Sequence, residues 1–177
     1  MAKLITKANE YGQLELNQVA FRRDGRIEAQ CRLDDEIEDY VENGMILAIV
    51  PVNHTVKYPK ADGTDEHLAL NYTTEHRYDE RDIGLKTFKL DKGTFLPRLG
   101  YFAKGDKFTT NTVTYTGTLE ALKAAIKEGE VYGAPSAKGA EAPGYIAVGA
   151  KTNASVVKAI EFTTMPDGSD AIKFIVL

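Results

Sequence analysis

The chain has 177 residues, 43% of them hydrophobic and 27% charged, a composition typical of a globular protein. Its formal net charge of −4 argues against broad phosphate binding, so nucleic acid is not an expected partner. A single cysteine, Cys31, excludes an internal disulfide. No apolar run approaches the roughly 18 residues that a membrane span needs, so a membrane partner is not expected either.

The N-terminal segment predicts a β-hairpin. Residues 12–21, GQLELNQVAF, alternate apolar and polar side chains, which is typical of a half-buried strand. The pair Asp24-Gly25 favours a tight turn because both residues tolerate positive φ. We therefore expect the strand near Gln18–Phe21 to pair with a strand at Arg26–Arg32.

The acidic segment Asp34–Gly44, DDEIEDYVENG, is a candidate second short helix. Its apolar residues Ile37, Tyr40 and Val41 follow a spacing of three and four, and Gly44 would end the helix. The acidic residues lack the ligand spacing of a calcium loop, so we expect them to face solvent. Neutralising Asp35 and Glu38 together should then change stability by less than about 1 kcal/mol.

The middle of the chain predicts further strands. Residues 44–52, GMILAIVPV, are a short apolar run typical of a buried strand, which HTVKYP continues across a bend at Pro51. A second turn at Asp62-Gly63 precedes an alternating segment that ends at Tyr72.

Residues 94–117, TFLPRLGYFAKGDKFTTNTVTYTG, combine aromatic residues, glycines and many threonines. We expect a rigid hairpin in which Phe108, Val113 and Tyr115 alternate with threonines on a half-exposed pleated surface.

One helix is clearly predicted, at Leu119–Lys127, with Thr118 as its N-cap and Gly129 just beyond its end. Residues 133–144, GAPSAKGAEAPG, are small and proline-containing, so they predict a loop or a subdomain boundary. A third turn at Asp167-Gly168 leads into a terminal strand. The expected fold is thus one β-rich domain over 1–177, sandwich-like or barrel-like and rich in hairpins, with one clear helix and a candidate second one.

The residues with reactive side chains show no catalytic or metal-binding pattern. The three histidines, His54, His67 and His76, lack the close spacing of zinc motifs. Cys31 lies between Gln30 and Arg32 on a predicted strand, where cysteine is usually a small buried apolar residue. No phosphate-binding or nucleophile-elbow motif occurs. We therefore expect no metal, no cofactor and no enzymatic activity.

Four segments carry a resemblance to a known family: LELNQVAFRRDGRIEAQCRLD, VENGMILAI, FLPRLGYFAKGDKFTTNTV and TMPDGSDAIKFIVL. Together they resemble the small structural proteins of tailed bacteriophages that decorate the head beside the major capsid protein. The resemblance covers most of the chain and rests on strand and turn patterns. It implies a virion protein, made in the host cytoplasm, whose partners are the capsid lattice and further copies of itself on the shell.

On this interpretation the segment PRLGYFAKGD is a contact surface. Arg98, Tyr101 and Phe102 are the predicted contact residues, because arginine and large aromatic residues dominate the energetics of protein interfaces. Phe102 has an equally strong alternative, packing inside the sheet.

Two other classes of function remain open at this point. One is a different virion part, a tail-tube or head–tail connector subunit, which a long loop that orders on ring assembly would favour. The other is a small-ligand-binding or enzymatic β domain with a noncontiguous site, which a deep pocket lined by two of the histidines would favour.

Overall fold

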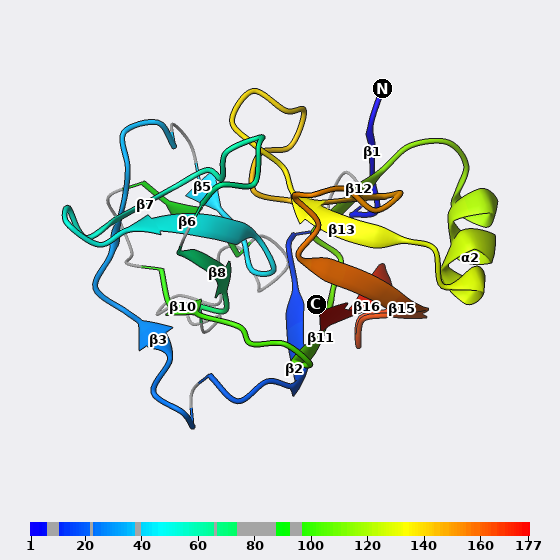
Figure 1. Cartoon of the computed structure of the whole chain (residues 1–177), viewed down its shortest axis with the longest axis horizontal. Helices are drawn as coiled ribbons and strands as arrows, with labels where there is room; N and C mark the ends of the chain where they lie inside the picture. Colours follow the sequence, from blue (N-terminus) through cyan, green and yellow to red (C-terminus); the bar gives the residue numbers. More distant parts are fainter. Residues whose placement is uncertain (7–10, 22, 38–39, 66, 74–87, 93–96) are drawn as a thin grey trace.

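The computed structural model describes residues 1–6, 11–21, 23–37, 40–65, 67–73, 88–92 and 97–177. Within these residues the fold is mainly β with one helix, as predicted (Figure 1). The helix is α2, Leu119–Glu128. The strands are β1 (Lys3–Leu4), β2 (Leu14–Gln18), β3 (Ile27–Glu28), β4 (Arg32–Leu33), β5 (Tyr40–Val41), β6 (Ile46–Val50), β7 (Thr55–Lys57), β8 (Leu68–Asn71), β9 (Leu90–Asp91), β10 (Leu99–Gly100), β11 (Lys107–Thr110), β12 (Val113–Tyr115), β13 (Tyr132–Pro135), β14 (Ile146–Gly149), β15 (Val157–Thr164) and β16 (Asp170–Val176).

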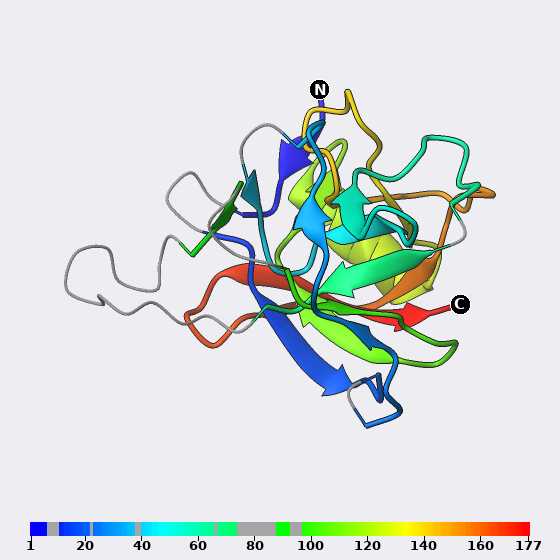
Figure 2. The ribbon, with the colours of Figure 1, turned by 90° about the vertical axis from the view of Figure 1, so that its left-hand side faces the viewer.

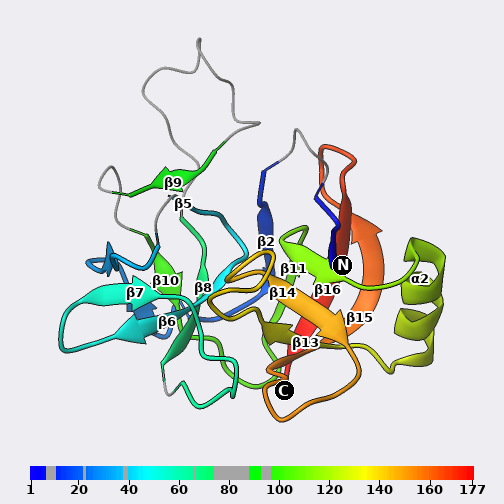
Figure 3. The same cartoon turned by 90° about the horizontal axis from the view of Figure 1, so that it is seen from above.

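The strands form two large sheets and a two-stranded ribbon. An eight-stranded sheet has the order β1-β12-β14-β13-β15-β16-β11-β2, and a six-stranded sheet has the order β3-β10-β8-β6-β7-β4. The ribbon pairs β5 with β9. Figures 1 and 3 show the six-stranded sheet beside the eight-stranded one, with α2 on the far side of the large sheet.

Strand β6 is apolar along its whole length because it is buried on both faces. Ile46 packs in the core of the eight-stranded sheet, whereas Leu47 and Ile49 pack in a second core that belongs to the six-stranded sheet. Successive side chains of a strand point to opposite faces, so one strand can supply both cores. The predicted buried strand is therefore confirmed. The segment after Pro51 turns back, however, and β7 lies antiparallel to β6.

The predicted helix is confirmed with both of its ends. The Thr118 side chain accepts a hydrogen bond from the Ala121 N–H, and Gly129 takes a left-handed φ of 75°. Leu122 and Ile126 are the buried residues of the helix. They pack it against the core of the eight-stranded sheet, which we call the first core. The turn at Asp167-Gly168 and the terminal strand after it are also confirmed, and the structure pairs that strand, β16, with β15.

The predicted hairpin between Gln18–Phe21 and Arg26–Arg32 is wrong. The turn itself exists: the Arg26 N–H donates to the Phe21 carbonyl at 2.8 Å. But β2 pairs with β11 and β3 pairs with β10, so the chain leaves one sheet and enters the other at this turn. The cause is burial. Phe21 is fully buried against Gly100, where an added Cβ would lie 2.6 Å from the Phe21 ring.

The candidate second helix at Asp34–Gly44 is also wrong in the part that the structure describes. Residues 35–36 form a turn and Tyr40–Val41 form β5. Ile37 and Val41 are fully buried in the second core. A turn followed by a strand buries both side chains, so their spacing does not require a helix. Glu38 lies outside the described residues. Asp35 is exposed as expected, but Glu42 is only 2% exposed, so the acidic run does not face solvent throughout.

Two further segments differ from expectation. Residues 94–117 do not form one hairpin: Leu99–Gly100 belong to the six-stranded sheet and Lys107–Thr110 to the eight-stranded one, while 94–96 lie outside the described residues. Residues 133–135 are part of β13. Glycine stands at 133 because the neighbouring strands crowd it: an added Cβ would lie 2.6 Å from Ile146 and 2.7 Å from Val157. The remaining loop is closed by a hydrogen bond from the Gly144 N–H to the Ser136 carbonyl at 2.8 Å.

Candidate functional site

The segment from Arg98 to Asp106 connects the two sheets and carries the predicted contact residues. Arg98 is exposed, and its backbone is fixed by a bond from its N–H to the Thr73 hydroxyl at 2.9 Å. Tyr101 and Phe102 are half-buried and pack against different cores, Tyr101 against the second and Phe102 against the first. The structure therefore does not bring the three side chains together on one face.

The loop that follows β10 is held rigidly. Arg26 donates to the Tyr101 carbonyl at 2.8 Å and lies 3.7 Å from the Asp106 carboxylate. That carboxylate also accepts the Ala103 N–H at 2.8 Å. Backbone bonds to Val176 fix both Gly105 and Asp106 on the terminal strand. Hence the exposed tip, residues 103–105, projects from a base that is tied to two other parts of the fold (Figure 2).

Ile27 was not singled out from the sequence. It lies opposite Gly100 in the β3–β10 pairing and is 43% exposed. We call the exposed residues along β10 and its loop, Ile27, Arg98 and the tip 103–105, the β10 surface. It combines an exposed guanidinium, exposed apolar area and a loop tip held at its base, whereas Tyr101 and Phe102 are half-buried against different cores. The expected hairpin would pair the strand of Ile27 with the strand near Gln18–Phe21. That pairing gives no indication that Ile27 lies near Arg98.

At the turn from β11 to β12, buried polar side chains join segments that are distant in the chain. The Thr110 hydroxyl donates to the Gln13 carbonyl at 2.6 Å, and the Thr112 hydroxyl donates to the Asn43 carbonyl at 2.5 Å. Asn111 accepts the Gln13 N–H at 2.7 Å and donates to the Tyr11 carbonyl at 3.0 Å. These threonines and this asparagine are buried, so the expectation of a half-exposed threonine surface is wrong. They satisfy backbone groups of two distant segments that would otherwise be buried without partners.

We call the buried hydrogen bonds around Thr110, Asn111, Thr112 and Glu42 the polar junction. Glu42 is its charged group. One of its carboxylate oxygens accepts the Gly12 N–H at 3.2 Å, and the other accepts the Tyr145 hydroxyl. The Lys89 ammonium lies 3.9 Å from the first oxygen and 3.7 Å from the centre of the Tyr40 ring. Burial, and then the charge of Glu42, raise the pKa of the Tyr145 hydroxyl far above its usual range. The phenol therefore stays protonated and donates its hydrogen bond to Glu42. Glu42, Gly12, Tyr145 and Lys89 thus hold distant segments of the chain together.

Cys31 is buried, as its predicted strand environment suggested, and lies in the second core. Burial first, and the charge of Glu28 second, raise the pKa of its thiol to about 11. Since the thiolate is the reactive form, we expect Cys31 to react with a thiol reagent far more slowly in the folded protein than in urea. Absorbance after addition of a disulfide reagent measures this. Equal rates in both states would contradict the buried position.

Two of the three histidines lie on the surface. His54 and His67 are exposed, and His76 falls outside the described residues. Among the residues that the structure describes, no three His, Cys, Asp or Glu side chains are grouped so as to hold a metal ion. The described residues also contain no helix long and apolar enough to cross a membrane.

Comparisons of the chain with protein-family models, curated proteins and solved structures gave no match.

Proposed function

We propose that this protein is a structural component of a tailed-phage virion that binds the assembled head and stabilises it. The observation that carries the proposal is the β10 surface: an exposed Arg98, exposed Ile27 and a loop tip clamped at its base. A contact loop that is already rigid loses little conformational entropy when it binds. The resemblance of the four sequence segments to head-decoration proteins supports the same proposal.

Binding to a lattice gives this surface its effect. Each copy would touch more than one capsid subunit, and further copies on the shell would repeat the same contacts. A site shared between subunits exists only after assembly, so affinity for a free subunit is low and affinity for the shell is high. Stabilisation of the shell follows by linkage, because the protein binds the intact shell in preference to its dissociated subunits.

The experiment is a heat-release assay on undecorated heads. With the wild-type protein added, we expect the temperature at which heads release DNA to rise. The variant Arg98→Ala should lose most of the shift, because truncating a central interface arginine typically costs about 2 kcal/mol or more. Lys151→Ala, an exposed change on the loop before β15, is the matched control and should keep the shift. No shift with the wild-type protein would refute the proposal, and a full shift with Arg98→Ala would place the contact elsewhere.

A further inference from the structure

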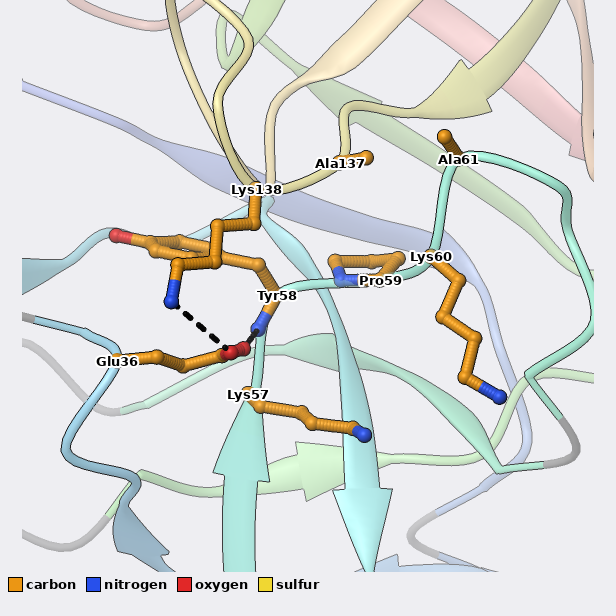
Figure 4. A pocket seen from close by; sticks show the side chains of 8 residues that line it. All are labelled: Glu36, Lys57, Tyr58, Pro59, Lys60, Ala61, Ala137 and Lys138. Carbon is orange, nitrogen blue, oxygen red and sulfur yellow. Dashed lines mark hydrogen bonds and ion pairs between the residues drawn. The ribbon is translucent and has the colours of Figure 1, made fainter.

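The surface also has a shallow hollow of about 250 Å³ (Figure 4). Its walls come from three segments: the turn that holds Glu36, the end of β7 with the residues after it, and the loop between β13 and β14. We call it the lysine hollow. Its lining residues are Glu36, Lys57, Tyr58, Pro59, Lys60, Ala61, Ala137 and Lys138.

The single carboxylate of the lysine hollow is already engaged. Glu36 accepts the Tyr58 N–H at 2.9 Å with one oxygen, and the Lys138 ammonium lies 3.6 Å from the other. The Glu36 side chain is about one-fifth exposed, at 22%. Glu36 and Lys138 thus offset each other in charge, and the pair fixes the loop of Lys138 over the end of β7.

Two ammonium groups remain beyond that pair. Figure 4 shows the Lys57 and Lys60 side chains extending away from the Glu36 carboxylate, whereas Lys138 extends toward it. Neither Lys57 nor Lys60 forms an ion pair with any carboxylate in the described part of the chain. The charge of Lys60 contributes weakly to lowering the pKa of Asp62, whose main partner is Thr64 in its own turn.

The apolar floor of the lysine hollow strengthens the electrostatic interaction of these ammonium groups with a bound ion. Pro59 is buried, Tyr58 is half-buried, and Ala61 and Ala137 add apolar wall. An ion held against an apolar wall is screened less by water than one on an open surface. The lining residues hold three lysines and one carboxylate, so the hollow itself is cationic and partly enclosed, with Asp62 and Asp65 on the loop just beyond Lys60.

We propose that the lysine hollow binds a carboxylate side chain from an acidic segment of the partner protein. This inference rests on the proposed function, because it names the chemistry of a second contact with the capsid subunit. Lysine ammonium groups act as point charges and accept a carboxylate without a fixed fork geometry. A nucleic-acid strand fits less well, since it needs a basic groove that follows several phosphates. Asp62 and Asp65 beside Lys60 repel any anion, so the hollow suits one carboxylate better than a run of phosphates.

The first test uses the full chain and a blocked tetraglutamate peptide. In a titration followed by amide NMR, we expect shifts at residues 57, 58, 60, 137 and 138. Replacing both lysines, Lys57→Gln with Lys60→Gln, should weaken binding by about fivefold or more, the effect expected for two surface charge pairs. The control, Lys127→Gln with Lys151→Gln, changes net charge equally at exposed sites and should bind the peptide as the wild type does.

Three results of this titration would overturn the inference. They are equal affinity in the two double variants, shifts that fall outside the hollow, and no shift at millimolar peptide. A single-stranded oligonucleotide of equal charge is a further arm, and tighter binding of it at the same residues would assign the hollow to phosphates instead.

The second test separates this inference from the proposed function. Wild-type protein and the Lys57→Gln, Lys60→Gln variant are each sedimented with heads. If both bind heads equally, the proposed function stands and the lysine hollow is not a contact. If neither binds heads while the peptide still binds the wild type, the carboxylate site stands and the proposed function fails. We expect the variant to bind heads at least about fivefold more weakly than the wild type, by the same two charge pairs.

Discussion

Replacing Glu42 with alanine is expected to lower the free energy of unfolding by about 3–5 kcal/mol, the cost of removing one partner from a buried charged cluster. The substitution leaves the Gly12 N–H and the Tyr145 hydroxyl buried without their acceptor. It also removes the counter-charge of Lys89. Urea unfolding followed by circular dichroism measures the loss.

The matched control is Asp35→Ala. Asp35 forms an ion pair with Lys92 at 2.8 Å, but its side chain is fully exposed. Exposed pairs of this kind contribute little to stability because water and salt screen them, so the control should unfold almost as the wild type does. If Glu42→Ala and Asp35→Ala lowered stability equally, Glu42 would not be the buried centre of the polar junction.

Replacing Gly44 with alanine is expected to be the other strongly destabilising change. Gly44 has a φ of +84°, and an added Cβ would lie 2.1 Å from the Thr110 hydroxyl and 2.8 Å from that of Thr112. The left-handed conformation alone costs a non-glycine residue about 1–2 kcal/mol, and overpacking adds about 1–3 kcal/mol more. Both hydroxyls hold backbone carbonyls of the polar junction, so neither can move away without losing its bond.

Gly25→Ala separates the two causes of that loss. Gly25 has a similar φ of +69°, but nothing lies within 4 Å of an added Cβ. Its replacement should show only the conformational cost of about 1–2 kcal/mol. Thermal unfolding of the two variants compares them directly. A loss at Gly44 no larger than that at Gly25 would mean that the crowding at the polar junction is relieved by a small shift.

What the sequence predicts here is local structure. The cap of α2, the turn at Asp167-Gly168 and the apolar run of β6 follow from residue spacing, and each is confirmed. The pairing at Asp24-Gly25 failed because a turn signal specifies the turn and leaves the partner strand undetermined. Here the burial of Phe21 against Gly100 decides which sheet the chain enters. Such contacts join residues far apart in the chain, and no local pattern records them.

In the candidate sites, too, local sequence predicts single residues but not the contacts between distant segments. Arg98 could be selected because its residue type is common in interfaces, whereas Ile27 and the lysine hollow arise only when separate segments meet. The sequence places Glu42 in an acidic run that is expected to face solvent, because residues 34–39 are mostly acidic. The local sign that Glu42 could be buried is the apolar run that begins at Met45, three residues later. Buried threonines at 109–112 were likewise hidden, because threonine suits exposed strands as well as buried hydrogen bonding.

The proposed function requires this protein to recognise an assembled shell. The most direct measurement mixes the purified protein with undecorated heads and, separately, with dissociated capsid protein, and then sediments or gel-filters each mixture. We predict saturable binding to the heads and little binding to the free subunits, because the proposed site would be shared between subunits only in the lattice. Equal binding to both, or binding to neither, would contradict the claim.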